Sequence, residues 1–285
     1  MMEGAMTEGT MTEGTMTEET TTGKKAVFFD IDGTLFEQGK DVPASTINAI
    51  HKLRENGHLA FVCSGRSRIM IPQVPILSIG FDGVVAACGM YASYGEKILF
   101  DEEMTQEQLA DILPVLQETD TMYILEGTEY IYYDERTIHH AIDDWYIRSI
   151  HAMIPGHFIP VPEKMSDIHA CKISLQTQKE NVDRVLRQAE HFFNSMLHIE
   201  NIGEIVPKGF SKAEGIRRVC EKLGVKREDT FAVGDSINDV DMLQYAGTGI
   251  AMGNGTDVAK ECADYVTTGI YEDGIYHAMK HFELI

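Results

Sequence analysis

Two aspartates, Asp30 and Asp32, lie two positions apart directly after an apolar run at residues 26–29. In an extended segment this spacing aims both side chains to one side, so one carboxylate can act as a nucleophile and the other as an acid and base on the same substrate atom. Close carboxylates repel each other, and Mg²⁺ would neutralise them because it prefers carboxylate, carbonyl and phosphate oxygens. In a chain with 45 acidic residues, the motif alone also fits ordinary turn chemistry.

A second polar turn, Ser64-Gly65, follows the apolar run at residues 59–63. It offers a hydroxyl and unobstructed backbone amides, which are the parts of a small anion-binding site. An ordinary turn is the alternative interpretation of this pair.

Lys212 lies where a helix is expected to begin. Ser211 and Glu214 have the spacing of a capping box, with Ser211 as the N-cap and Glu214 three positions later. A cation in the first helical turn opposes the helix dipole, so Lys212 needs another reason to be there. Stabilising a transferring phosphoryl group is one such reason, and a solvated surface lysine is the alternative.

A third polar segment, residues 234–239, follows the apolar run at 230–233 and opens another expected helix. Asp235, at the end of that run, can reach a metal ion held by Asp30. Asn238 and Asp239 come one helical turn later and can hydrogen-bond a phosphate and orient Lys212, respectively. Taken singly, each of these residues also fits an N-cap or a solvated surface position.

The elements around these turns alternate between short apolar runs and helical patterns. This alternation indicates parallel β-α-β units, whose sheets bind ligands outside the carboxyl ends of the strands. All the candidate residues above follow such runs or begin helices, so they are expected to meet at one edge of the sheet. The expected strands are residues 26–29, 59–63, 84–87, 230–233 and 249–252.

The pattern changes between about residues 103 and 201. Segments 122–125, 130–133 and 171–176 look like strands, and a helix with apolar positions from Val182 to Phe193 lies among them. An inserted second domain is the simplest explanation.

Composition excludes several classes of function. A formal net charge of −21 opposes binding to nucleic acid. Residues 1–23 repeat Met-Thr-Glu-Gly units with little apolar content, and we expect a disordered acidic tail.

No apolar run approaches the roughly 18 residues that span a bilayer, and no signal peptide is evident, so we expect a cytoplasmic protein with no membrane partner. The sequence indicates no particular oligomeric state.

Together these segments resemble the haloacid dehalogenase (HAD) superfamily of phosphatases, and most closely its Cof-like branch. The resemblance runs from about Lys24 to the C-terminus. One departure is Cys88-Gly89, where the Cof-like pattern usually has Asn-Gly, and it concerns substrate contacts near the hinge rather than the catalytic set. The matching segments are Asp30-Ile31-Asp32-Gly33-Thr34, Ser64-Gly65-Arg66, Lys212, Gly234-Asp235-Ser236-Ile237-Asn238-Asp239 and Ala251-Met252-Gly253-Asn254.

The resemblance implies an α/β fold: a doubly wound, Rossmann-like core with a parallel sheet and an inserted α/β cap of the C2 type. We therefore expect a catalytic core at residues 24–102 and 202–285, and a cap that determines substrate specificity at residues 103–201.

The leading hypothesis is hydrolysis of a small phosphomonoester, such as a sugar phosphate or a related metabolite, in two in-line steps. Asp30 attacks phosphorus, and Asp32 protonates the leaving alcohol and then activates water. One Mg²⁺ is expected on Asp30, the backbone carbonyl of Asp32, and Asp235. The expected ligands of the phosphoryl oxygens are Ser64, the Gly65 amide, Lys212 and Asn238.

Two alternatives stay open from the sequence. The same residues could serve a phosphosugar mutase that passes the phosphoryl group to a second sugar hydroxyl. A non-catalytic phosphoacceptor module also phosphorylates an aspartate at a strand end, but it has no need of a second carboxylate at Asp32 or of an inserted domain.

Overall fold

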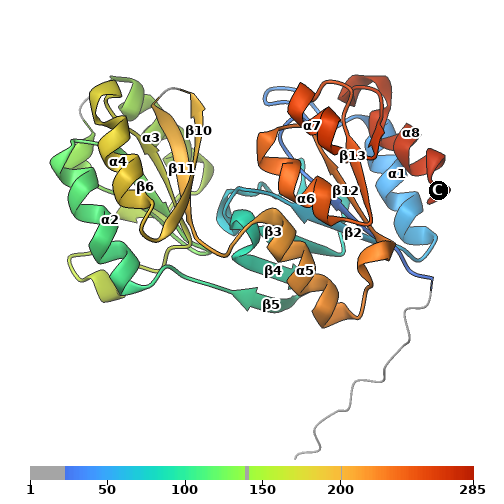
Figure 1. Ribbon diagram of the computed structural model, residues 1–285, viewed down its shortest axis with the longest axis horizontal. Coiled ribbons are helices and arrows are strands. Elements are labelled where there is room, and N and C mark those ends of the chain that lie inside the picture. The colour runs from blue at the N-terminus through green and yellow to red at the C-terminus, as the bar shows by residue number, and fades with distance from the viewer. Residues whose placement is uncertain (1–22, 139–140, 200) are drawn as a thin grey trace, which may run out of the picture.

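The computed structural model describes residues 23–138, 141–199 and 201–285, which form two lobes around two separate sheets (Figure 1). Of the tail expected at residues 1–23, all but Gly23 lies outside the described residues. Within the described ranges, no helix is both long and apolar enough to cross a membrane.

The larger lobe, which we call the core, is built on an eight-stranded sheet. Its order is β14 (Tyr265–Val266), β13 (Thr248–Ala251), β12 (Thr230–Gly234), β1 (Ala26–Phe29), β2 (Leu59–Cys63), β3 (Gly83–Ala86), β4 (Tyr91–Tyr94) and β5 (Lys97–Asp101). β1 pairs in parallel with both β12 and β2, while β4 and β5 join antiparallel at one edge. Every residue of β1, β2 and β12 is buried, which explains their continuous apolar sequences.

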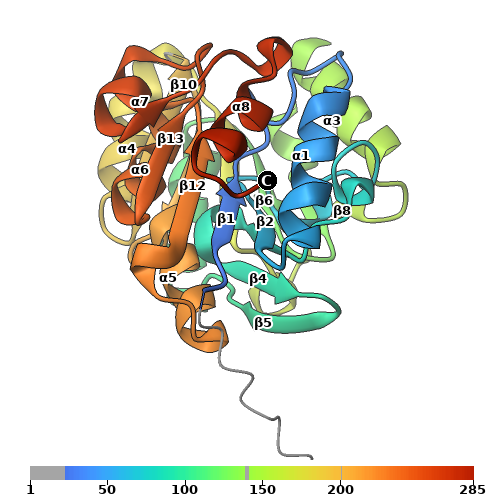
Figure 2. The same cartoon turned by 90° about the vertical axis from the view of Figure 1, so that its right-hand side faces the viewer.

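Helices cover both faces of the core sheet (Figure 2). One face carries α1 (Ala44–Glu55) and α8 (Gly274–His281), whose apolar residues share one hydrophobic cluster with that face of the sheet. The opposite face carries α5 (Lys212–Leu223), α6 (Val240–Tyr245) and α7 (Asp257–Cys262). The doubly wound α/β core predicted from the sequence is confirmed.

The smaller lobe, which we call the cap, contains a six-stranded sheet. Its order is β10 (Phe193–Ile199), β11 (Ile202–Pro207), β9 (Lys172–Gln176), β6 (Met122–Glu126), β7 (Ile131–Tyr133) and β8 (Phe158–Pro160). Neighbouring strands are antiparallel except for β7 and β8. Helices α2 (Gln106–Glu118) and α4 (Val182–Ala189) pack on one face through a hydrophobic cluster, and α3 (Ala141–Met153) belongs to a different cluster with β6 and β7.

Two details of the cap differ from expectation. The second domain boundary was expected between residues 201 and 202, but β11 pairs with β9 and β10, so we place this boundary after Pro207. The apolar pattern predicts a helix that reaches Phe193, whereas α4 ends at Ala189 and Phe193 begins β10. The prediction was wrong because Phe193, the first buried residue of β10, lies four positions after Ala189, and this spacing is the same as that of one more helical turn.

The third core strand has the expected length but lies one residue earlier, at Gly83–Ala86 instead of residues 84–87. It ends at Ala86, because Ala87 and Cys88 both adopt positive φ angles, 49° and 51°, and begin the 3₁₀ turn η3 (Ala87–Gly89). A strand cannot continue through left-handed backbone. This turn therefore places Cys88 at the interface between core and cap.

The cap rests on the core through two apolar contacts. Ile69 and Met70 of the core pack against a cap cluster that includes Ile150 of α3. At the second contact, Met90 of the core and Val206 of the cap share one cluster. These contacts seat the cap beside the turns that carry the candidate residues.

Candidate active site

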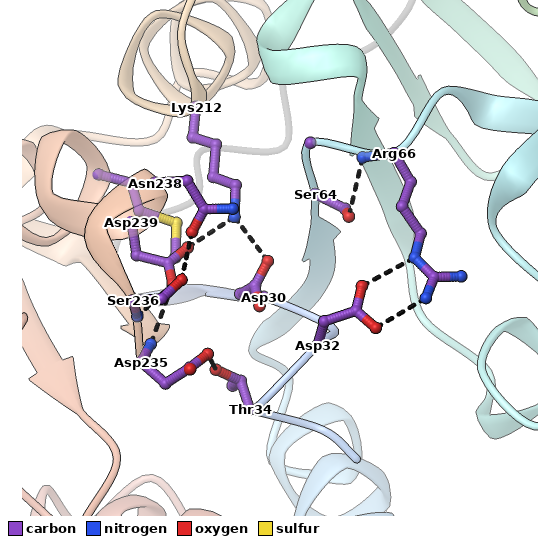
Figure 3. Close-up of polar contacts among 12 residues, drawn as sticks. Asp30, Asp32, Thr34, Ser64, Arg66, Lys212, Asp235, Ser236, Asn238 and Asp239 are labelled. Carbon is purple, nitrogen blue, oxygen red and sulfur yellow. Dashed lines mark hydrogen bonds and ion pairs between the residues drawn. The ribbon is translucent and has the colours of Figure 1, made fainter. Parts of the chain in front are cut away.

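Asp30 and Asp235 follow two neighbouring strands, β1 and β12, and lie side by side (Figure 3). The Asp30 amide donates to the Val233 carbonyl at 2.9 Å, and Thr34 Oγ1 donates to Asp235 Oδ1 at 3.0 Å. Gly33 makes this approach possible: its φ is +88°, and a Cβ there would lie 2.3 Å from Asp235 Oδ2. The first and third predicted motifs therefore meet at the carboxyl edge of the sheet.

Lys212 is buried between the carboxylates, with 1% of its surface exposed. Its Nζ donates to Asp30 Oδ1 at 2.5 Å and to Asp239 Oδ1 at 2.6 Å. The alternative of a solvated surface lysine is wrong. Asp239 also accepts hydrogen bonds from the backbone amides of Asp235 and Ser236, at 2.9 and 3.0 Å.

Only half of the capping box that was expected at the start of α5 is formed. Ser211 caps the helix by accepting from the Glu214 amide at 3.2 Å. The Glu214 carboxylate instead pairs with Arg217, so it does not return to the Ser211 amide. The Ser211 N-cap and Asp241, which accepts from the Ala213 amide at 3.0 Å, together bind amides of the first turn, which carries Lys212.

The electrostatics of this cluster favour a bound cation. Oxygens of Asp30, Asp235 and Asp239 lie within 4.8 Å of one another, with the single ammonium of Lys212 among them. Burial and then the Asp239 charge raise the pKa of Asp30 well above its usual value, against the opposing effect of Lys212. The same two causes raise the pKa of Asp235 to about 6. Excess negative charge in a buried site is what a hard divalent cation relieves, so these residues fit Mg²⁺.

Asp32 points away from this cluster (Figure 3). Its carboxylate accepts two hydrogen bonds from Arg66, from Nε at 2.8 Å and from Nη2 at 2.7 Å, and its side chain is 51% exposed. The expectation that both carboxylates face the same side is therefore not met by their side chains. Arg66 was not predicted as a site residue, although it directly follows Ser64-Gly65 in a segment that matches the family pattern.

The second predicted motif forms a buried turn beside Asp30 and Asp32. Ser64 is 2% exposed, and its Oγ accepts from the Arg66 amide at 3.2 Å, which leaves the hydroxyl proton available to another acceptor. A Cβ built on Gly65 would lie 3.5 Å from Glu204 Oε1 of the cap, so the turn lies close beneath the cap.

Asn238 and Lys212 line a cavity of about 360 Å³ between core and cap. Asn238 is held by Ser236, whose Oγ donates to Asn238 Oδ1 at 2.5 Å. Cys88 lines the same cavity, and burial raises the pKa of its thiol to about 12, which keeps the thiol protonated at neutral pH. Its left-handed backbone is one that asparagine tolerates well, in keeping with the Asn-Gly pattern from which this chain departs.

Comparison with known proteins identifies the family. The haloacid dehalogenase-like hydrolase family matches residues 27–279. The Bacillus subtilis relative YkrA is 29% identical over 279 residues, which cover 92% of this chain and 98% of that protein. The 5-amino-6-(5-phospho-D-ribitylamino)uracil phosphatase YitU of the same organism is 25% identical over 90% of this chain and 96% of its own length.

Solved structures agree with this assignment. The structure described as the HAD subclass IIB sugar phosphatase BT4131 superposes with a TM-score of 0.78 at 28% identity, covering 92% of this chain and all of that one. Fold and relatives together define the class as a phosphoric monoester hydrolase. The chain belongs to the haloacid dehalogenase-like hydrolases, in their Cof-like branch.

Proposed function

We propose that this chain is a Mg²⁺-dependent phosphatase that hydrolyses small phosphomonoesters through an aspartyl-phosphate on Asp30. The observation that carries the proposal is the position of Asp30: it directly follows the central strand β1, and its Oδ1 lies 2.5 Å from the buried Lys212 ammonium. Phosphoryl transfer depends mainly on positioning and charge stabilisation, and this buried cluster can supply both.

Mg²⁺ would be held by Asp30, the backbone carbonyl of Asp32, and Asp235. Both oxygens of Asp239 already accept hydrogen bonds, so we assign it to orienting Lys212. When bound, Mg²⁺ would neutralise the carboxylates and draw charge from the phosphoryl oxygens.

The protein residues perform two displacements. In the first, an Asp30 oxygen forms a bond to phosphorus as the ester oxygen leaves, and Asp32 gives that oxygen a proton. In the second, Asp32 takes a proton from water, the water oxygen bonds to phosphorus, and the bond to Asp30 breaks. Inorganic phosphate leaves, and both aspartates return to their starting states.

The phosphoryl oxygens would be held by the Ser64 hydroxyl, the Gly65 amide, Lys212 and Asn238. Ser64 supports this assignment because its hydroxyl proton is available, and Asn238 because it lines the cavity between core and cap. In this structure both oxygens of Asp32 accept from Arg66, so Asp32 would leave this pair and turn toward the ester oxygen to act as the acid.

A sugar phosphate or related metabolite is the substrate class that we favour. BT4131 is described as a sugar phosphatase, and YitU is named for a substrate that carries a phosphorylated ribityl chain. A cavity of about 360 Å³ has room for a leaving group of this kind.

A panel of phosphorylated metabolites tests the proposal, with release of inorganic phosphate as the readout and the Asp30→Asn variant as the blank. Release from a sugar phosphate without a bisphosphate activator supports a phosphatase. Transfer that requires such an activator would instead show a phosphosugar mutase.

A further inference from the structure

The side of the cap sheet that faces the core carries a buried charged cluster that the proposed mechanism does not use. Lys172 of β9 forms an ion pair with Glu204 of β11, and its Nζ lies 3.9 Å from Glu126 Oε1 on β6. Ser174 Oγ donates to the same Glu126 oxygen at 2.5 Å. Lys172, Glu126 and Glu204 are only 3%, 5% and 9% exposed.

Strand alternation separates this cluster from the hydrophobic core of the cap. The alternate residues Leu125 and Ile173 pack into the cluster beneath α2 and α4, so Glu126 and Lys172 face the other way. A buried ion pair contributes little stability compared with apolar residues of similar size. A purely structural explanation of these three charges is therefore weak.

Lys172 crosses the interface and contacts the predicted phosphate-binding turn. Its Nζ donates to the Gly65 carbonyl at 3.0 Å. The flanking carbonyls are held by the core itself, since the Cys88 amide donates to Ser64 and the Ala87 amide donates to Arg66, at 3.3 and 2.7 Å. The Gly65 carbonyl thus accepts from the cap, whereas the carbonyls on either side of it accept from the core.

The peptide group between Gly65 and Arg66 links this contact to the Ser64 hydroxyl. The Gly65 carbonyl and the Arg66 amide belong to the same trans peptide, so they point in opposite directions. While Lys172 holds the carbonyl, the Arg66 amide is directed at Ser64 Oγ, to which it donates at 3.2 Å. The Ser64 oxygen then accepts from the Arg66 amide, and its own proton can be donated to another oxygen.

Charge and burial keep this contact in place. Burial alone would lower the pKa of Lys172, but the carboxylates of Glu126 and Glu204 outweigh it and raise that pKa above its usual value. The apolar contacts at Met70 and at Val206 lie in the same interface between cap and core. Lys172 is thus a charged donor at physiological pH.

We infer that Lys172 is a positioning residue by which the seated cap sets the geometry of the Ser64-Gly65 turn. The inference rests on the proposed phosphate-binding role of that turn. Lifting the cap withdraws the donor from the Gly65 carbonyl and frees the peptide plane to rotate. The turn is then ready for phosphate only when the cap is closed.

The test is the Lys172→Met variant, with p-nitrophenyl phosphate as substrate and inorganic phosphate as inhibitor. We expect kcat/KM to fall about 10- to 100-fold and the inhibition constant of phosphate to rise about tenfold, as for loss of a charged hydrogen bond that orients a binding group. Ser174→Ala is the matched control, because it alters the same cluster without touching Gly65, and both constants should stay within about twofold of wild type.

Folding is checked by the melting temperature of each variant. Because Lys172→Met leaves two buried carboxylates together, a second variant combines it with Glu126→Gln and Glu204→Gln. We expect the same loss of phosphate affinity there. A folded variant of either kind with wild-type kcat/KM and phosphate affinity overturns the inference. An inactive wild-type protein would overturn the proposed function itself, which separates the two failures.

Discussion

The three carboxylates around Lys212 are not equivalent at the scale of single residues. One oxygen of Asp239 accepts from Lys212 and the other accepts from the amides of Asp235 and Ser236, so Asp239 orients these groups. Asp30 and Asp235 each make one described side-chain hydrogen bond and have raised pKa values. These two are the residues whose charge should respond to a cation.

The raised pKa of Asp235 gives a stability prediction for the metal-free protein. The folded pKa of about 6 exceeds the ordinary 3.8, so the protonated carboxyl favours folding at low pH, and this contribution is lost as pH rises through 6. In chelator at pH 8, Asp235→Asn should therefore be more stable than wild type, by up to about 2 kcal/mol after allowing for partial exposure. Thermal melts from pH 4 to 8 check this.

The difference between the two proteins should shrink below pH 5, where the wild-type carboxyl takes up its proton. Added Mg²⁺ should stabilise wild type more than the variant. A difference that does not vary with pH would show that the charge of Asp235 is not the cause.

The sequence predicted which residues lie close together better than it predicted where their side chains point. Asp30, Lys212 and Asp235 follow strands or begin helices, so the parallel fold brings them together as expected. The direction of Asp32 could not be predicted from its spacing, because its partner Arg66 comes from the turn after a different strand.

At the scale of elements, the turn after β1 depends on Gly33. An alanine at this position would have to adopt a positive φ, and its Cβ would lie 2.3 Å from Asp235 Oδ2. We expect Gly33→Ala to lower kcat/KM at least tenfold, because the displaced carboxylate belongs to the site. Gly39 is a matched control, since its φ is +85° but no atom lies within 4 Å of its Cβ position.

Gly39→Ala should show only the cost of a left-handed alanine, roughly 1 kcal/mol, with kcat/KM close to wild type. Melts and steady-state kinetics on both variants separate backbone strain from the clash. Equal losses of activity in the two variants would contradict the role of Gly33.

The N-cap of α5 should matter for catalysis as well as for stability. Ser211→Ala should cost about 1 kcal/mol and lower kcat several-fold, because Lys212 is the first residue of the capped helix. Thr105→Ala removes the comparable cap of α2, far from Lys212 in sequence and in the other lobe. It should lose similar stability with an unchanged kcat, and a parallel fall in kcat for both variants would count against the proposal.

Apolar runs predicted the buried parallel strands well, because strands covered on both faces have few polar positions. The cap was harder, since most of its strands are antiparallel and mix charged residues such as Glu126 and Lys172 with apolar ones. The pattern there predicted an inserted domain but missed that β11 completes its sheet, because a pairing of distant segments leaves no local signal.

At the scale of the whole molecule, a chain with a net charge of −21 must bind an anionic substrate. A local cation would resolve this conflict, because a bound divalent ion dominates the field of its site. Activity on p-nitrophenyl phosphate should therefore vanish in chelator and return with Mg²⁺. Full activity in chelator would contradict the metal assignment.

The central claim is that Asp30 carries the phosphoryl group, and trapping that adduct tests it most directly. Asp32→Asn keeps the nucleophile but removes the base that activates water, a loss of ~10² to 10⁴-fold. p-Nitrophenolate leaves with little need of a proton, so this variant should accumulate the intermediate. Acid quench and mass spectrometry should then find one phosphate on the peptide containing Asp30, and none in Asp30→Asn. An adduct on another residue, or turnover retained by Asp30→Asn, would contradict the account.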